Sequence, residues 1–303
     1  GAALAATPLG AAAPMLGASA AHYRRVALGG FEVTTLLDGA APFPEPQGIF
    51  GTDQSVADVE AALAAADLPT GAIEIGFAPT LVNTGAELVL FDTGNGAGAQ
   101  PARGNLLSAM EAAGYSADQV DVVVITHMHP DHIGGMMTDG APTFPNARYA
   151  TGRVEYDFFA SEDRIGSPVE GLHQMVTNLV APMADRMSFL EPGQSVVSGI
   201  DAVNAFGHTP GHMAYHIESE GKRLMVTADA ANHFVLSLEH PDWHVRFDAD
   251  KAAAAATRRQ LFGMLDADGV PFVGYHMPFP AMGFVTASGS GFRWTPATYQ
   301  FSL

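Results

Sequence analysis

Residues 121–132 read DVVVITHMHPDH, and this stretch decides the fold. Its first five residues are almost continuously apolar, the pattern of a strand that is buried on both faces. Directly after the strand come three imidazoles and one carboxylate, those of His127, His129, His132 and Asp131. They cannot all pack into an apolar core unpaired, because a buried polar group without a partner costs free energy. A strand that ends at a cavity would direct all four side chains into it.

The spacing within this cluster favours two metal positions over one. His127 and His129 are two residues apart, so an extended chain directs both to the same side. Pro130 then changes the chain direction, and Asp131 and His132 approach a nearby but different point. Divalent ions such as zinc accept imidazole and carboxylate ligands together. A histidine-rich solvated loop is the alternative, and the buried strand before the cluster argues against it.

Two metal positions need more ligands than this cluster holds, and the chain has 12 histidines in all. His208 lies in the stretch FGHTPGH, which predicts a sharp turn. Asp229 ends a predicted strand that begins at residue 224, and His276 ends another that begins at residue 271. Strand ends from distant segments can meet at one edge of a sheet. We therefore expect these three side chains to complete the site.

Strand and helix patterns alternate along the rest of the chain. Strands are predicted over residues 31–37, 77–82, 87–91, 121–125, 214–217, 224–227 and 271–275, and helices over 104–113, over 251–265 and from Ser55 onward. Strands come first, a helix follows, and the order repeats in the second half. We therefore predict an α/β (α+β) fold, a four-layer αββα sandwich, in one domain that covers residues 23–303.

The N-terminal residues 1–22 form a zone of different composition. Residues 1–20 carry no charge and are mostly Ala, Gly and Pro, and prolines interrupt them too often for a membrane span. The stretch resembles the apolar core and small-residue end of a secretory signal, with Ala18-Ser19-Ala20 as the cleavage site. We expect a periplasmic or secreted protein; the alternative is an Ala-rich arm on a cytoplasmic enzyme.

Composition excludes several classes of function. The 303 residues are 48% hydrophobic and 15% charged, which suits a large core and not a disordered chain. The net charge of -18 disfavours nucleic acid and polybasic membrane attachment. The absence of cysteine removes thiolate ligands and cysteine nucleophiles. The predicted partner is a small, apolar molecule, with no nucleic acid and no membrane; a homodimer is left open.

The chain resembles the metallo-β-lactamase superfamily, specifically its dinuclear hydrolases, over residues 23–303. Four features occur in family order: the H-x-H-x-D-H run, the G-H-T-P-G-H turn, a lone Asp at a strand end and a late histidine. The resemblance implies two divalent metal ions, with zinc the first choice. It assigns His127, His129 and His208 to the first metal, Asp131, His132 and His276 to the second, and Asp229 to a bridge between them.

The resemblance also implies roles for residues around the metals. Asp92, which follows a predicted strand, would orient the ligand loop; a turn cap is the alternative. His212 would support the turn, since His208 already fills the ligand position. Asp131 and Asp229 would be the catalytic residues, and Asp131 would also accept a proton. An apolar substrate pocket is expected from phenylalanines, chiefly Phe158, Phe159, Phe279 and Phe284, with Phe43, Phe50 and Phe77 as further candidates.

Smaller features select a branch of the superfamily. The missing cysteine excludes the β-lactamases with a Cys ligand, and Asp229 excludes those with three histidines per metal site. His129 stands where flavodiiron proteins carry Glu, and the net charge disfavours tRNA-processing nucleases. The stretches YHMPFP (275–280) and GFRWTP (291–296) most resemble methyl parathion hydrolase and lactonase-type members.

The implied reaction is hydrolysis of an apolar ester, lactone or organophosphate triester by a metal-bound hydroxide. Two divalent cations bring four positive charges, and two carboxylates and a hydroxide offset three. The excess lowers the pKa of bound water to about 7. A hydroxyacylglutathione-type thioesterase is one alternative, but no basic cluster near the motifs would hold glutathione. A non-enzymatic metal-binding protein on the same fold is the other.

Overall fold

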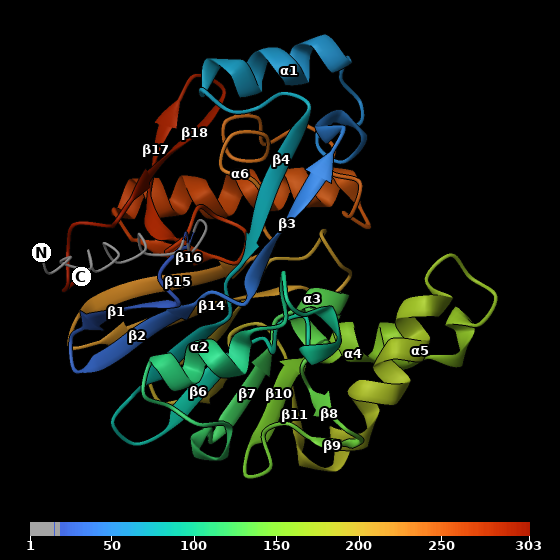
Figure 1. Cartoon of the computed structure of the whole chain (residues 1–303), viewed down its shortest axis with the longest axis vertical. Coiled ribbons are helices and arrows are strands. Elements are labelled where there is room, and N and C mark those ends of the chain that lie inside the picture. Colours follow the sequence, from blue (N-terminus) through green and yellow to red (C-terminus); the bar gives the residue numbers. More distant parts are fainter. Residues whose placement is uncertain (1–14, 16–18) are drawn as a thin grey trace, which may run out of the picture.

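Two seven-stranded β-sheets form the centre of the computed structural model, which describes residue 15 and residues 19–303 (Figure 1). The first sheet has the spatial order β1 (Tyr23–Leu28), β2 (Phe31–Leu36), β5 (Thr80–Asn83), β6 (Leu88–Phe91), β7 (Val122–Ile125), β10 (Arg148–Gly152) and β11 (Met187–Leu190). The second has the order β12 (Ser195–Val197), β13 (Ile200–Asn204), β14 (Met213–Ser219), β15 (Lys222–Ala228), β16 (Phe272–Gly274), β17 (Met282–Ser288) and β18 (Gly291–Pro296).

Helices and two short hairpins surround the sheets. The hairpins are β3 (Gly39–Pro44) with β4 (Ala72–Phe77), and β8 (Met137–Thr138) with β9 (Ala141–Pro142). The α-helices are α1 (Val56–Ala65), α2 (Leu106–Ala112), α3 (Pro130–Ile133), α4 (Arg153–Ala160), α5 (Glu170–Leu179) and α6 (Lys251–Asp268). Short 3₁₀ turns are η1 (Pro46–Gly48), η2 (Ala97–Ala99), η3 (Ala117–Gln119), η4 (Glu162–Arg164) and η5 (Ala181–Arg186).

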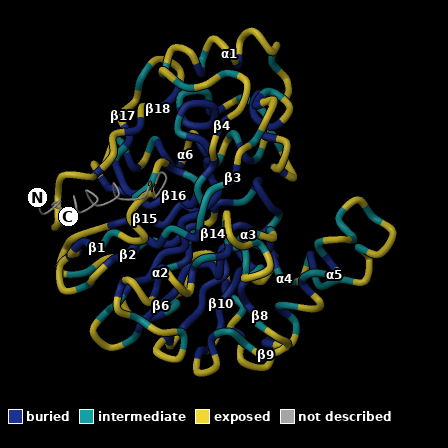
Figure 2. The backbone as a smooth tube through the Cα atoms, in the orientation of Figure 1, coloured by how far each residue is buried: buried dark blue, intermediate teal, exposed yellow. Residues whose placement is uncertain are grey.

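The strand β7 shows how the layers are held together. Successive side chains of a strand point to opposite faces. Val122 and Val124 pack in the cluster that contains residues of both sheets. Val123 and Ile125 pack on the other face, in the cluster that includes α2 and α5. All four side chains are buried, and Figure 2 shows the inner strands buried and the loops exposed. The predicted α/β fold with its four-layer αββα sandwich is confirmed.

Most predicted elements are present with shifted ends. Ser55 caps α1, since its hydroxyl accepts a hydrogen bond from the backbone N–H of Asp58 at 3.2 Å. The predicted strand over residues 77–82 is divided in the structure. Phe77 ends β4, and β5 begins only at Thr80, because Pro79 between them has no N–H to donate to a sheet.

Residues 39–77 leave the first sheet and form a separate unit, which we call the cap. It contains the β3–β4 hairpin and α1, seen at the top of Figure 1. Its own apolar cluster packs against a segment that precedes α6, and the buried members are Ile49, Phe50, Val59, Leu63, Ile73, Ile75, Val235, Leu236 and Val245. The β3–β4 hairpin was not predicted from the sequence.

The described helices include none that is long and apolar enough to cross a membrane. The predicted N-terminal arm, residues 1–22, lies for the most part outside the described residues.

Arg258 on α6 is a fully buried charged residue, with 0% of its surface exposed. Its guanidinium donates to the carboxylate of Asp248 at 2.9 Å and to the carbonyl oxygens of Pro241 and Trp243 at 2.8 and 3.3 Å. The pair therefore ties α6 to the segment that supports the cap.

We expect Arg258→Met to lower the free energy of unfolding by about 3–5 kcal/mol, because it leaves the buried Asp248 carboxylate without its guanidinium partner. The adjacent Arg259, whose partner Asp242 is exposed, is the matched control. Arg259→Met should cost about 0–1 kcal/mol. Urea unfolding of the metal-loaded protein, followed by circular dichroism, measures both values; equal losses would contradict this account of Arg258.

Candidate metal centre

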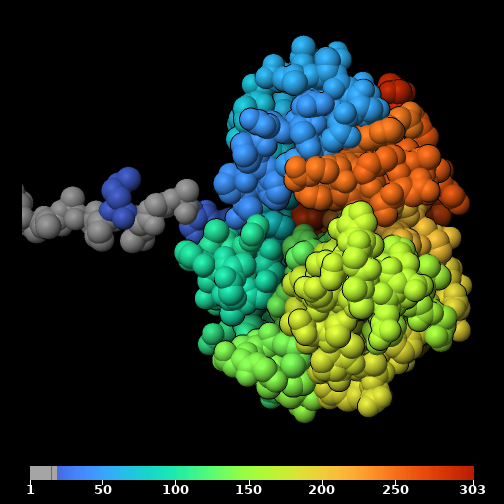
Figure 3. All heavy atoms as spheres, turned by 90° about the vertical axis from the view of Figure 1, so that its right-hand side faces the viewer, coloured from blue at the N-terminus to red at the C-terminus, as the bar shows by residue number. Residues whose placement is uncertain are grey.

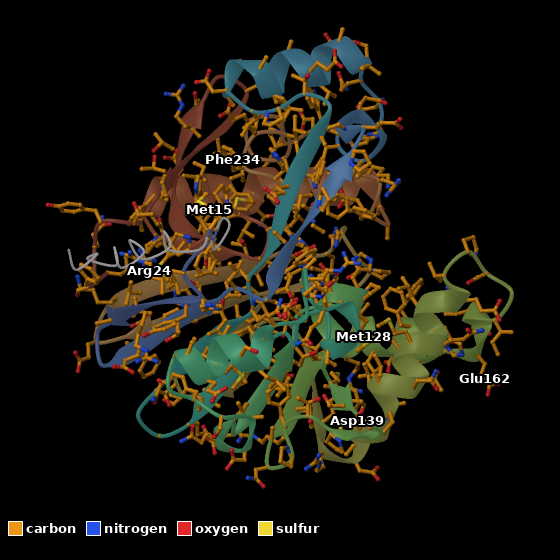
Figure 4. All side chains as sticks on the ribbon, viewed as in Figure 1. Met15, Arg24, Met128, Asp139, Glu162 and Phe234 are labelled. Carbon is orange, nitrogen blue, oxygen red and sulfur yellow. The ribbon has the colours of Figure 1, made fainter. Side chains whose placement is uncertain are left out.

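All seven predicted ligands lie at carboxyl ends of strands or in the turns that follow them. Four come from the loop after β7 and from α3: His127, His129, Asp131 and His132. The other three follow β13, β15 and β16, in that order: His208, Asp229 and His276. Met128 marks the ligand loop in Figure 4, in the interior of the molecule. The carboxyl ends of strands from both sheets therefore meet at the candidate metal site.

The first group of donors contains only imidazoles. Nδ1 of His129 lies 3.1 Å from Nε2 of His127 and 3.0 Å from Nε2 of His208. Burial lowers the pKa of His129 to about 3, with the neighbouring His208 adding to the effect. Burial, followed by the charge of His132, holds the pKa of His127 well below its usual value. Neutral imidazole is the form that binds metal ions, so the imidazoles of this first group are in the protonation state that metal binding requires.

The second group combines imidazoles with a carboxylate. Oδ2 of Asp131 lies 3.5 Å from Nε2 of His132 and 3.4 Å from Nε2 of His276. Burial alone would lower the pKa of His276, yet the carboxylates of Asp229 and Asp131 raise it to about 10. The same competition raises the pKa of His132 above its usual value. The negative charge of the neighbouring carboxylates therefore favours the protonated form of His132 and His276. A bound metal cation can replace these protons, because it supplies the same positive charge.

Asp229 lies between the two groups and is 3% exposed. Its Oδ2 is 3.4 Å from Nε2 of His208 and 3.1 Å from Nε2 of His276. Its Oδ1 is 3.4 Å from Nε2 of His132. One carboxylate therefore faces both groups, as a bridge must.

The donor set fits two divalent cations. Nε2 of His132 and Oδ1 of Asp229 are both buried and have no hydrogen-bond partner among the described residues. Such orphaned atoms are costly unless another group satisfies them. One set of imidazoles and one mixed set of imidazole and carboxylate donors, joined by one carboxylate, are chemistry that suits zinc or a similar ion.

Asp92 lies beneath the ligand loop and is buried. Its Oδ2 accepts from the hydroxyl of Thr126 and faces Nδ1 of His132, both at 2.8 Å. Its Oδ1 accepts the backbone N–H of Thr126 at 2.8 Å. Asp92 follows β6 and His127 follows the parallel neighbour β7, so both come from the same sheet edge. Asp92 thus holds the ring of His132 with Nε2 toward the centre.

His212 uses both ring nitrogens within the protein. Its Nδ1 faces the carbonyl oxygen of Ala205 at 3.1 Å, and its Nε2 accepts the backbone N–H of Asp229 at 3.1 Å. Burial, followed by His208, lowers its pKa to about 3, which keeps the ring neutral for these two contacts. His212 therefore fixes the backbone of Asp229 and is not placed as a ligand.

Three further supports were not assigned from the sequence. Asp248 faces Nδ1 of His208 at 2.9 Å and pairs with Arg258 on its other side. The carbonyl oxygen of Gly76, in the cap, faces Nδ1 of His276 at 2.9 Å. No local pattern reveals either contact, because the partners lie 40 and 200 residues apart in the chain.

Glu155 is the third unassigned support and joins two ligand loops. Its Oε1 accepts the backbone N–H of Met128 at 2.8 Å. Its Oε2 accepts from the hydroxyl of Thr209 at 2.7 Å and from the N–H of Gly211 at 2.9 Å. Burial raises its pKa to about 7. A buried acid in the first turn of α4 gives no clear signal in the sequence, because Arg153 beside it is also charged.

A cavity of about 360 Å³ opens over the centre. Apolar side chains form most of its wall: Phe43, Phe50, Ile75, Phe77, Leu172 and Phe247. Polar residues beyond the ligands are Asn95, Arg103 and Asn232, and Asn232 donates to Oδ2 of Asp229 at 3.0 Å. Figure 3 shows the face on which the α4–α5 region lies next to the segment before α6. These two parts of the chain supply the wall residues Leu172 and Phe247.

The four phenylalanines chiefly expected to line the pocket do not line this cavity. Phe158 and Phe159 pack in the helix-covered cluster below the first sheet. Phe284 packs against the core between the sheets, and Phe279 is not among the residues that line the cavity. Of the further candidates, Phe43, Phe50 and Phe77 do lie in the wall, and all three belong to the cap.

Comparison with known proteins identifies relatives among lactonases. The N-acyl homoserine lactonase of Bacillus cereus is 24% identical over 153 residues, which are 50% of this chain and 55% of that protein. A lactonase of the same name from Bacillus thuringiensis is 25% identical over 127 residues, 42% of this chain and 44% of that one. The chain spans about half the length of the curated relatives it matches.

Two solved structures resemble the whole described fold. One is AidC, a dizinc quorum-quenching lactonase in complex with a product, N-hexanoyl-L-homoserine: 28% identity, TM-score 0.86, covering 92% of this chain and 98% of AidC. The other is the hydrolase AbOPH of the beta-lactamase superfamily. It is 27% identical with a TM-score of 0.85, and the match covers 93% of this chain and 100% of AbOPH.

The family model for the metallo-beta-lactamase superfamily matches residues 79–268. This range is more than half of the chain and includes six of the seven ligand positions, all but His276. The chain belongs to the metallo-beta-lactamase superfamily.

Proposed function

We propose that this chain is a dinuclear zinc hydrolase that opens lactones and cleaves apolar esters, with N-acyl homoserine lactones as its main substrate class. One observation carries the proposal: two donor groups joined by Asp229 form the floor of a cavity whose wall is mostly apolar. An apolar wall binds the body of such a substrate, and a few convergent polar groups orient its reacting end.

Two divalent cations bound here would supply a water of lowered pKa and positive charge for an oxygen that becomes anionic. The chain's own residues set the geometry. Asp229 spaces the two donor groups, and Asp92 and Asp248 fix the rings of His132 and His208.

Asp131 is the carboxylate best placed to move a proton. It lines the cavity, and its side chain is 21% exposed against 4% for Asp229. Burial alone would raise its pKa, but the charges of His132 and His276 hold it well below the usual value. The carboxylate therefore stays ionised at neutral pH, which is the form that a metal ligand or a proton acceptor requires.

The relatives support the substrate class. The curated matches are N-acyl homoserine lactonases, and AidC binds a product of that reaction. Aryl esters and organophosphate triesters present a carbonyl or phosphoryl oxygen in the same way, so we propose them as side substrates. A glutathione thioesterase is less well supported, since Arg103 is the one Lys or Arg in the described cavity wall.

We expect protein purified without chelator to contain two equivalents of divalent metal, chiefly zinc, per chain. Exhaustive chelation should abolish ester hydrolysis, and added zinc should restore it. Elemental analysis alongside an aryl-ester assay measures both. A single equivalent in fully active protein, or activity that survives complete metal removal, would rule out the dinuclear mechanism.

We expect Asp229→Ala to reduce kcat/KM by more than about 10³-fold and to lower the metal content, because the variant loses the carboxylate that faces both donor groups. His212→Ala should cost only about 10–100-fold, since it disturbs a support and no ligand. Metal content and kcat/KM of the two variants distinguish these roles. Equal damage from both would show that the ligand assignment in the 206–212 turn is wrong.

We expect the metal-loaded protein to hydrolyse N-hexanoyl homoserine lactone with kcat/KM above about 10⁴ M⁻¹s⁻¹. Turnover of p-nitrophenyl esters and of a dimethyl aryl phosphate triester should be slower. Glutathione thioesters and anionic phosphodiesters complete the panel. Preference for either of these last two would refute the proposed substrate class and leave the metal centre unaffected.

A further inference from the structure

Arg103 presents an unpaired guanidinium to the cavity. It is the one Lys or Arg in the described wall, and it makes no ion pair and no side-chain hydrogen bond with a described residue. Its guanidinium carbon lies 5.9 Å from the centre of the Phe77 ring. A guanidinium has five N–H donors and no acceptor. Because no described residue accepts a hydrogen bond from Arg103, these donors can bind an acceptor on a molecule in the cavity.

The loop that carries Arg103 is held firmly by Asp38, whose surface is 0% exposed. The Asp38 carboxylate accepts backbone N–H groups of Asn95 at 2.9 Å, Gly104 at 3.2 Å and Leu106 at 2.8 Å. Three N–H donors on one buried carboxylate fix the loop on both sides of Arg103.

The cap fixes the same loop from the other direction. The N–H of Ala40 donates to the carbonyl oxygen of Ala102 at 3.1 Å. Gly39 adopts a φ of +139°, and a Cβ there would lie 2.2 Å from that oxygen and 2.4 Å from Cα of Arg103. Only glycine permits so close an approach. The backbone beneath Arg103 is therefore preorganised.

Phe77 lies against both Arg103 and one of the metal ligands. Its ring lies edge-on to His276, with 5.5 Å between the ring centres, and the guanidinium of Arg103 lies over the same ring. The guanidinium thus packs on Phe77 in the wall and belongs to none of the groups that could hold a metal ion. A group bound there belongs to the body of the substrate and not to the ester under attack.

We propose that Arg103 is a specificity-determining residue that binds an acceptor oxygen on the substrate body. The inference rests on the proposed function and narrows its substrate class to lactones and esters whose acyl chain carries such an oxygen. A neutral keto or amide carbonyl and a terminal carboxylate both offer this chemistry, because Arg pairs with either.

The test compares p-nitrophenyl esters of matched length: hexanoate, 5-oxohexanoate and the adipate half-ester. Metal-loaded wild type should prefer at least one oxygen-bearing ester over hexanoate by about 10-fold in kcat/KM. Arg103→Met should abolish the preference, mainly through KM, and change kcat on hexanoate by less than about twofold. A response to 5-oxohexanoate assigns a neutral carbonyl, and a response to the half-ester alone assigns a carboxylate. A preference that Arg103→Met leaves unchanged, or no preference in the wild type, overturns the proposal.

Arg246 offers a matched control. Its guanidinium lies 4.9 Å from the centre of the Phe247 ring, and Phe247 lines the cavity while Arg246 does not. Arg246→Met removes the same charge close to the same cavity and should leave the preference intact. If Arg246→Met reduced it as much as Arg103→Met, the preference would reflect the general electric field, and a contact at Arg103 would be refuted.

Binding measurements separate this inference from the proposed function. Lactam analogues of N-acyl lactones, with and without an oxo group on the acyl chain, can be titrated into the metal-loaded protein by calorimetry. Tighter binding of the oxo analogue by wild type, and not by Arg103→Met, supports the proposal even if no ester is hydrolysed. Equal binding by the two proteins overturns it even if the wild type is an active lactonase.

Discussion

The buried carboxylate of Asp229 is the group on which the rest of the structure depends. Two donor groups face it, and removing such a charge from water is costly unless opposite charge compensates it. The compensating imidazoles follow the ends of three other strands, β7, β13 and β16, which belong to both sheets. The sandwich places these ends together because its parallel pairs, β6–β7 and β15–β16, direct their carboxyl ends to one edge. At this edge, the fold therefore brings the histidine side chains close to the buried Asp229 carboxylate.

Three of the five ligand rings are also held on the side that faces away from the centre. Asp92 faces the far nitrogen of His132, Asp248 that of His208, and the Gly76 carbonyl that of His276. These contacts leave Nε2 directed at the centre. They also explain a buried arginine in a helix remote from the cavity: Arg258 balances the Asp248 charge that orients His208.

The features that could be predicted from the sequence are those formed by residues that lie close together in the chain. The ligand run follows an apolar strand directly, and an isolated Asp229 at a strand end is conspicuous against its apolar neighbours. Glu155 and Asp248 gave no comparable signal, because their partners lie tens of residues away and the contacts exist only in three dimensions. The β3–β4 hairpin was missed because prolines at 42 and 44 break the alternating pattern of its first strand. Aromatic residues near a motif, such as Phe279, do not reveal which way their side chains face.

The floor and the wall of the cavity come from different kinds of structure. The floor consists of strand ends, fixed by the two sheets and by buried hydrogen bonds. The wall comes from the cap, from the loop held by Asp38, from α5 and from the segment before α6. Substitutions in the wall can alter which molecule fits without moving a ligand, since no wall phenylalanine contributes a donor to the centre. Reaction type therefore belongs to the sheet edge, and substrate choice belongs to the cap and the loops beside it.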